Sequence, residues 1–392
     1  MKKLIWHVVG VLLFGVAVLP TEAGFKSLYI FGDGLSTTTD NKTGSQSYYG
    51  KRYSNGRVWV EVLAQRQGLT YDATKNNSYF DHNSTLTAVD VAAFVPPPDV
   101  ANDLFIVWVN NADTYDEATV GIPLTQLQWQ LANTVSVQNH LQIITNLYAK
   151  GVRTLIMPNV VDLSKIPFFD AGTLVTTEHN GCVDYNTRFA NTIAQARALC
   201  PGLTIYTPDF YALLNNVLAN PASYGLTNAL QAGHSVSAID TIYPLTVTNN
   251  PATNYIYWDS TDPSAKFHAV IADVAQQIIS PAQISGIAVL NGSNRLDLVN
   301  VPVGLNGFVD GATNLIPANW TSVTNMTSTA TAQSIFVAQP VTATTNVGSA
   351  FSSSTTKIVP ADAGDPGLLG APTPPYVMQY YRLRFPYAWN WP

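Results

Sequence analysis

Short apolar segments alternate with longer amphipathic segments from residue 25 to about residue 279. The short segments are rich in β-branched and aromatic residues, which favour strands, while the longer ones carry apolar residues at helical spacing. The expected strands are residues 27–32, 104–109, 153–158 and 203–206. The expected helices are residues 58–67, 124–150, 182–199, 211–220 and 263–279. This alternation predicts an α/β fold, a three-layer α/β/α sandwich with a parallel, flavodoxin-like sheet.

The pattern changes after residue 282. The remaining segment is rich in Thr, Ser, Asn, Val, Gly and Pro, and it contains short alternating runs at residues 334–337 and 380–385. Such runs are typical of strands in an all-β unit. The sequence therefore predicts an α/β domain over residues 24–282, followed by a small C-terminal β-sandwich domain over residues 283–392.

The low charge of the chain argues against nucleic-acid binding, and its first 23 residues indicate export. Only 11% of the 392 residues are charged and the formal net charge is -6, so no basic run is present to neutralise the phosphates of a nucleic acid. Residues 1–23 carry Lys2 and Lys3, then an apolar run, and then Thr21-Glu22-Ala23, which is typical of a signal peptide cleaved after Ala23. An uncleaved membrane anchor is the alternative. No later segment is long and apolar enough to span a membrane, so we expect an exported protein, either secreted or at the cell surface.

Export would permit disulfide bonds, and the chain has two cysteines, Cys182 and Cys200. The segment between them has apolar residues at helical spacing. One continuous helix would hold the two sulfur atoms roughly 27 Å apart, far beyond the reach of a disulfide. We therefore expect two free, partly buried thiols.

The sequence F-G-D-G-L-S at residues 31–36 follows the first expected strand. It resembles the first motif of the SGNH/GDSL hydrolases, F-G-D-S-L-S, with one change. The nucleophilic serine of that family falls on Gly34, and glycine has no side-chain atom that could attack an ester carbonyl. The resemblance implies the α/β/α fold and, as ancestral activity, hydrolysis of carboxylic esters.

A second segment, Y-G-K-R-Y-S-N-G-R-V-W at residues 49–59, is similar to another motif of the family. The resemblance implies that Gly56 contributes a backbone N–H to the oxyanion hole, which stabilises developing negative charge. The alternative is that Asn55-Gly56 forms only a turn before the next helix.

The third motif of the family reads W-x-G-x-N-D, and residues 108–113 read W-V-N-N-A-D. An ungapped comparison places Ala112 where the family has its oxyanion asparagine. The resemblance then implies that Asn110 or Asn111 presents the amide instead. The alternative is that both asparagines only bond loop backbone at the end of the strand.

The last motif of the family, D-x-x-H-P, holds its acid and its base. Here the segment reads D-S-T-D-P at residues 259–263, so Asp259 is retained and Asp262 stands at the histidine position. A second carboxylate cannot be oriented as an imidazole is, and two like charges raise one pKa instead of producing a base. We therefore expect catalysis to be impaired at both the nucleophile and the base.

Several other residues are candidates for the site. Ser36, His82 and His268 could replace the missing groups, although each could equally be a packing residue. Asp33, Asp259 and Asp262 are expected at one edge of the sheet, where they could bind a cation such as calcium; the alternative is that Asp33 and Asp262 cap the helices that follow them. Trp108 and Trp258, with Asp33 and His82, are candidate substrate contacts, and most aromatic residues of these motifs are expected to serve as packing.

The resemblance supports two functions. The first is an exported ester hydrolase of the lipase/esterase class with impaired catalysis. The second is a non-catalytic surface protein that binds a glycan or acyl ligand. The expected partner in either case is a small-molecule ester, a lipid or an acylated glycan in the cleft, and no cofactor is implied.

Overall fold

The computed structural model describes residues 24–41, 48–241, 254–290, 293–313, 315, 317–338 and 379–386. Within them, five parallel strands form one sheet in the order β2-β1-β3-β4-β5. These strands are β1 (Leu28–Gly32), β2 (Asn76–Ser78), β3 (Leu104–Trp108), β4 (Thr154–Ile156) and β5 (Thr204–Tyr206). This order is the flavodoxin-like one, so the predicted sheet is confirmed.

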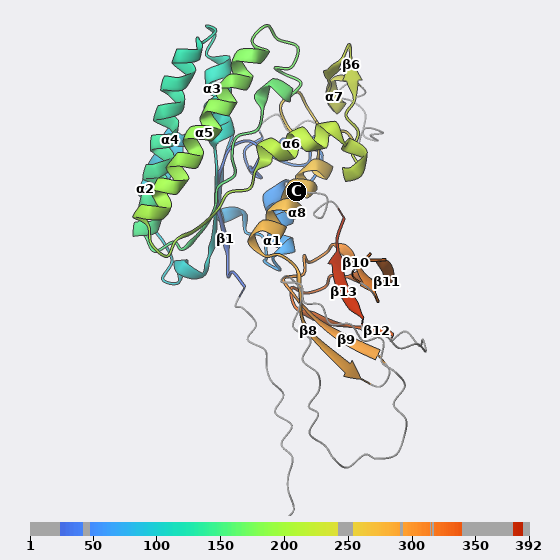
Figure 1. The fold of residues 1–392 in the computed structure, drawn as a ribbon. Helices are drawn as coiled ribbons and strands as arrows, with labels where there is room; N and C mark the ends of the chain where they lie inside the picture. The colour runs from blue at the N-terminus through green and yellow to red at the C-terminus, as the bar shows by residue number, and fades with distance from the viewer. Residues whose placement is uncertain are drawn as a thin grey trace, which may run out of the picture.

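Helices cover both faces of this sheet (Figure 1). One face carries α1 (Trp59–Arg66), α6 (Phe210–Ala219) and α8 (Ala265–Ile279). The other face carries α2 (Ser84–Ala93), α3 (Asn110–Thr119), α4 (Gln126–Ala149) and α5 (Val175–Leu199). All five side chains of β3 are buried between the two layers, as the near-continuous apolar run of a central parallel strand predicts.

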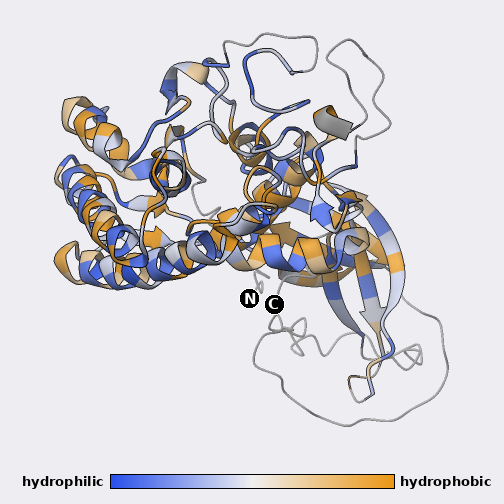
Figure 2. Cartoon of the chain, turned by 90° about the horizontal axis from the view of Figure 1, so that it is seen from above, coloured by the Kyte–Doolittle hydropathy of each residue, from blue (hydrophilic) through white to orange (hydrophobic). Residues whose placement is uncertain are grey.

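Local sequence explains where the main helices begin. Thr125 and Gln128 form a capping box at the start of α4, in which the side chain of each residue bonds the backbone of the other. Ser264 caps α8 by accepting a hydrogen bond from the Phe267 N–H. The helices carry both hydrophobic and hydrophilic residues (Figure 2), and their apolar sides pack on the sheet.

The C-terminal region holds two antiparallel sheets. One contains β8 (Gln283–Leu290), β9 (Ser293–Val299) and β12 (Gln333–Ala338), and the other contains β10 (Asn306–Ala312), β11 (Thr321–Thr327) and β13 (Tyr380–Arg384). Side chains from both sheets, among them Leu296, Val309 and Leu383, share one buried apolar cluster. The expected change to antiparallel β structure after residue 282 is therefore confirmed.

The smaller elements complete the described chain. They are the hairpin strands β6 (Leu230–Gln231) and β7 (His234–Ser235), the short helix α7 (Ala238–Thr241), and the 3-10 helices η1 (Ala73–Lys75), η2 (Val100–Asn102), η3 (Leu163–Lys165) and η4 (Pro221–Tyr224). No helix in these described ranges is long and apolar enough to cross a membrane. The expected signal peptide, residues 1–23, lies outside the described residues.

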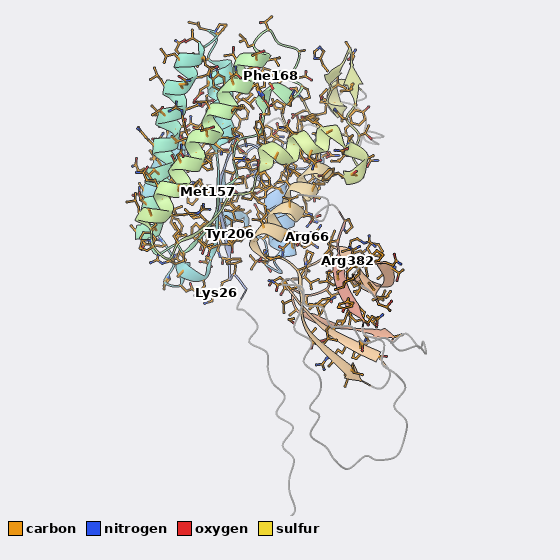
Figure 3. All side chains as sticks on the ribbon, viewed as in Figure 1. Lys26, Arg66, Met157, Phe168, Tyr206 and Arg382 are labelled. Atoms are coloured by element: carbon orange, nitrogen blue, oxygen red, sulfur yellow. The ribbon has the colours of Figure 1, made fainter. Side chains whose placement is uncertain are left out.

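Arg66 joins the α/β layers to the β region (Figure 3). Its Nε donates a 2.6 Å hydrogen bond to Asp273 Oδ1 on α8, and its Nη1 donates to the carbonyl of Val303 at 3.0 Å. The Val303 N–H in turn donates to the Arg66 carbonyl at 3.1 Å. The buried guanidinium of Arg66, on α1, thus bonds both α8 and the segment before β10.

Three elements of the parallel sheet and its covering helices, β2, α2 and α3, were not expected from the sequence. Strand β2 consists of Asn-Asn-Ser at the edge of the sheet, so no apolar run marks it. Helix α2 lay in a segment without an expected element, and α3 begins at Asn110 and Asn111, which were expected in a loop. Helix α8 begins at Ala265, two residues later than expected.

The two cysteines are free, as expected. Both are fully buried, whereas partial burial was expected: Cys182 lies on the inner side of α5 and Cys200 at its end, and their exposed fractions are 0% and 1%. Burial raises the pKa of both thiols, so neither is activated as a nucleophile.

Candidate functional site

A cavity of about 90 Å³ opens beyond the carboxyl ends of β1 and β3. Four of the residues that the motifs singled out line this cavity together: Asp33, Gly34, Asn111 and Asp262. The first and the last of them lie more than 200 residues apart in the chain. The other lining residues are Leu35, Phe80, Asp81, Ala112, Tyr115, Val161, Leu163, Ile166 and Thr261. This is the edge at which open α/β sheets place their ligands.

Gly34 lies two residues after β1, with open space over its Cα. A Cβ added there would lie 3.7 Å from the Tyr53 ring and 3.8 Å from the Phe80 ring, which are ordinary contact distances. Its φ also lies outside the left-handed region. Neither sterics nor backbone conformation therefore demands glycine at this position, and the missing hydroxyl is a chemical loss only.

The carboxyl of Asp33 is buried beside Gly34, with an exposed fraction of 3%. Its Oδ1 accepts a 3.0 Å hydrogen bond from the Leu35 N–H, and its Oδ2 is buried without a hydrogen bond of normal geometry among the described residues. Burial raises the pKa of Asp33 to about 7, although amide donors, including that of Asn111, lower it in part. Asp33 holds a turn and caps no helix, since none follows β1 directly.

Asp259 and Asp262 form a coupled carboxyl pair. Asp259 Oδ1 accepts hydrogen bonds from the Thr261 and Asp262 N–H groups at 2.9 and 2.7 Å, and Asp259 Oδ2 accepts one from the Tyr48 hydroxyl at 2.7 Å. The Thr261 hydroxyl donates to Asp262 Oδ2 at 2.8 Å. Asp259 itself does not line the cavity; it lies behind Asp262.

Burial, and then the charge of Asp259, raise the pKa of Asp262 well above its usual range. This is the direction expected from two neighbouring carboxylates. The raised pKa favours the protonated form of Asp262, which can donate a hydrogen bond. The expectation that Asp262 could cap the helix is wrong, because Ser264 caps α8. No group of three or more His, Cys, Asp or Glu residues in the described part of the chain is arranged to hold a metal ion.

The two asparagines after β3 have different partners. The Asn110 amide donates to the Pro158 carbonyl at 2.8 Å and is fully buried, so it is fixed outside the cavity. Asn111 lines the cavity; its Oδ1 accepts from the Val161 N–H at 3.1 Å, and its Nδ2 has no normal hydrogen bond within the described ranges. Of the two alternatives, Asn111 is the one whose amide can reach a ligand.

Gly56 does not line the cavity. A Cβ added to it would lie 2.6 Å from the Cβ of Ala265, so this glycine permits close packing against the start of α8. Its neighbours contact the same place: the Ser54 hydroxyl donates to the Pro263 carbonyl at 3.0 Å, and Asn55 Oδ1 accepts from the Ala265 N–H at 2.8 Å. The geometry gives this motif a packing role, and an oxyanion role for Gly56 stays a prediction.

The candidate replacements for serine and histidine are buried away from the cavity. The Ser36 hydroxyl accepts a 3.0 Å hydrogen bond from the Trp59 indole N–H. His82 bonds the Gly32 carbonyl at 2.9 Å and stacks on Tyr79, and burial lowers its pKa. His268 Nδ1 accepts from the Trp59 N–H at 3.3 Å, and burial lowers its pKa to about 3. All three residues pack the core.

The two tryptophans are also core residues. Trp108 packs edge-on against Trp59 and Phe210 with ring centroids 5.4 and 4.9 Å away, and Trp258 is 3% exposed in a small separate cluster. Neither lines this cavity, although Trp108 lines the smaller cavity that adjoins it, and a role of either tryptophan in substrate contact stays a prediction. Phe80 and Tyr115 supply the aromatic rings of the larger cavity instead. The sequence could have indicated Tyr115, because it lies four residues after Asn111 on the same side of α3.

Comparison with known proteins finds relatives among the GDSL esterases/lipases. No protein-family model matches the chain. Two curated relatives come from Arabidopsis thaliana: GDSL esterase/lipase At5g03810 is 28% identical over 148 residues, and GDSL esterase/lipase At2g30310 is 19% identical over 333 residues. The match to At5g03810 spans 35% of this chain and 42% of the relative. The match to At2g30310 spans 68% of this chain and 91% of the relative. These relatives support the resemblance to GDSL/SGNH proteins that the sequence motifs indicated.

Two solved structures resemble the chain at low identity. One is LAE5, an α/β hydrolase enzyme from the metagenome of Lake Arreo, Spain, with a TM-score of 0.38, 12% identity, and coverage of 65% of this chain and 95% of LAE5. The other is Axe2, an acetylxylan esterase from Geobacillus stearothermophilus, with a TM-score of 0.38, 14% identity, and coverage of 65% and 94%.

The similarity to GDSL esterases/lipases supports an ester-hydrolysing fold for this chain. Within that fold, the residues at the family's nucleophile and histidine positions, Gly34 and Asp262, line one cavity. Gly34 has no side-chain nucleophile and Asp262 has no imidazole, so neither residue carries the group that the family has at its position. Asn111 is the family-like element of the cavity that keeps a suitable polar group.

Proposed function

We propose that this GDSL/SGNH protein has lost serine-dependent ester hydrolysis and uses the cleft to bind a small-molecule ester, a lipid or an acylated glycan. One observation carries the proposal: the cavity that joins Gly34 to Asp262 is lined by neither serine nor histidine among the described residues. Without a nucleophile and a base, an oxyanion donor alone cannot supply covalent catalysis.

The shape of the cleft supports an acyl ligand. A second cavity of about 40 Å³ adjoins the first and shares Leu35, Val161, Ile166 and Thr261 with it. Its other walls are almost entirely apolar and come from α6, α8 and Trp108. A short hydrocarbon chain placed in the first cavity can therefore extend into an apolar environment, which favours transfer from water.

The remaining parts of the proposal rest on the sequence. Export through the signal peptide of residues 1–23 is inferred from its charged, apolar and small-residue segments. Residues 24–282 form the cleft-bearing domain, and residues 283–392 form a β domain that attaches or displays it.

Hydrolysis of p-nitrophenyl acetate and butyrate by the purified chain tests the loss of catalysis. We expect wild type and Gly34→Ala to equal buffer, and Gly34→Ser with Asp262→His to gain turnover, because position 34 has room for a side chain. Turnover by wild type that persists in Gly34→Ala would overturn the proposal, since other residues would then catalyse the reaction.

Binding is tested by calorimetric titration with p-nitrophenyl butyrate. Phe80 and Phe168 are both about half exposed near the cavity, but only Phe80 lines it. We expect Phe80→Ala to weaken binding about tenfold or more, because it removes apolar contact area, and Phe168→Ala to bind as wild type does. Equal losses in both variants, or no saturable binding by wild type, would contradict a ligand in this cavity.

A further inference from the structure

Two aromatic rings lie beside Gly34, and a third, that of Tyr115, lines the same cavity next to Phe80. The Tyr53 and Phe80 rings lie 3.7 and 3.8 Å from the point that a Cβ would occupy, and their centroids are 5.8 Å apart. The Tyr115 ring lies 6.4 Å from that of Phe80 and stands almost perpendicular to it. Ring faces and edges therefore border this part of the cavity on more than one side.

The polar lining of the same cavity is acidic. Asp33, Asp81 and Asp262 line it, and no Lys or Arg of the described residues does. Asp33 is the most informative of the three, because it is 3% exposed and its Oδ2 is buried without a hydrogen bond of normal geometry within the described chain. A buried carboxylate oxygen without a full set of donors is incompletely solvated unless a ligand supplies a donor or a positive charge.

Carboxylates act on Tyr115, which lines the cavity, and on Tyr53, whose ring lies beside Gly34. Burial raises the pKa of Tyr53 to about 12, and the charges that add to this shift belong to Asp40, Asp262 and Asp259. The pKa of Tyr115 is also raised, mainly by burial and then by the negative charges of Asp262, Asp116, Asp259 and Asp81. Carboxylates thus act on both hydroxyls, and together with the acidic lining of the cavity they favour a cation there.

We propose that this cavity binds the ammonium group of an organic cation, held between the rings of Tyr53, Phe80 and Tyr115 and paired with the Asp33 carboxylate. Aromatic faces attract alkylammonium groups, and a trimethylammonium group also gains from apolar contact with the same rings. The inference rests on the proposed binding function and names one chemical feature of its ligand. In an active esterase, a serine side chain at position 34 would occupy part of this space.

The test compares choline with 3,3-dimethyl-1-butanol, which has the same shape but no charge. Calorimetric titrations use the purified chain at pH 8, above the Asp33 pKa of about 7. We expect choline to bind at least about tenfold more tightly than the alcohol, and Asp33→Asn to abolish this preference. Asp99→Asn is the matched control, because Asp99 is an exposed carboxylate paired with Lys26 and does not line the cavity.

A second pair of variants separates the rings from the carboxylate and does not require Asp33→Asn to fold. Tyr53→Phe keeps the aromatic face and is expected to retain choline binding, whereas Tyr53→Leu keeps an apolar side chain and is expected to bind choline about threefold more weakly or worse. Equal affinity for choline and the uncharged alcohol, or no saturable choline binding, would overturn the inference. Butyrate-ester binding in the same preparation would then leave the proposed acyl-binding function standing.

Discussion

Asn55 caps helix α8 from a distance of 210 residues along the chain: its Oδ1 accepts a 2.8 Å hydrogen bond from the backbone N–H of Ala265. The first N–H groups of a helix have no partner within the helix, so this contact satisfies one of them. Ser54 and Gly56 contact the same helix start. The S-N-G segment thus fixes α8 directly after Asp259 and Asp262, and it positions the acid side of the cavity.

Gly56→Ala is expected to destabilise the fold by about 1–3 kcal/mol, because its Cβ would lie 2.6 Å from the Cβ of Ala265 and α8 would have to move. Gly34→Ala is the matched control, since a Cβ there meets only ordinary contacts, and we expect its stability to stay within about 0.5 kcal/mol of wild type. Urea unfolding measures both variants. Similar stabilities for the two would show that α8 does not pack on Gly56 as described.

Two ion pairs with the same 2.6 Å separation should differ strongly in their effect on stability. Arg66 and Asp273 are buried, with side-chain exposures of 8% and 3%, whereas Lys26 and Asp99 are about half exposed. We expect Asp273→Ala to cost about 3–5 kcal/mol, because Arg66 would remain buried without its partner. Asp99→Ala should cost less than about 1 kcal/mol. Chemical denaturation gives both values, and a small loss for Asp273→Ala would contradict the burial of this pair.

Glu117 on α3 should make stability fall as pH rises. Its pKa is raised to about 9, mainly by burial and then by the negative charges of Asp113, Asp116 and Asp184. Its Oε2 has no hydrogen-bond partner among the described residues. The folded state therefore keeps a proton that the unfolded chain releases above its ordinary pKa of 4.5. The contribution of Glu117 is fully present below about pH 4.5 and is lost as the pH rises toward 9.

Glu117→Gln removes this titration. We expect the stability of wild type relative to Glu117→Gln to fall by more than about 1 kcal/mol between pH 6 and pH 9, because each unit of pKa shift corresponds to about 1.4 kcal/mol. Thermal unfolding at several pH values measures the difference, in which the titrations of other groups cancel. Parallel pH profiles for the two proteins would show that Glu117 is not buried as a neutral acid.

The sequence by itself determined the class of fold and the side chains that are available at two motif positions. Apolar runs such as Leu104–Trp108 predicted four of the five strands of the parallel sheet, because periodicity reports local burial. The residues at positions 34 and 262 set the chemical limits of the cleft, since no fold can supply a hydroxyl to glycine or an imidazole to aspartate.

The tertiary structure decided everything that depends on contacts between distant segments. It fixed Asn110 on the Pro158 carbonyl and left Asn111 at the cavity, and it added the polar edge strand β2, whose three residues carry no apolar pattern. It also placed the S-N-G motif in contact with the start of α8, and it placed the rings of Tyr53 and Phe80 beside Gly34. The physical reason is that periodicity records which side of an element is buried, while the partner that buries it is set only when segments hundreds of residues apart pack together.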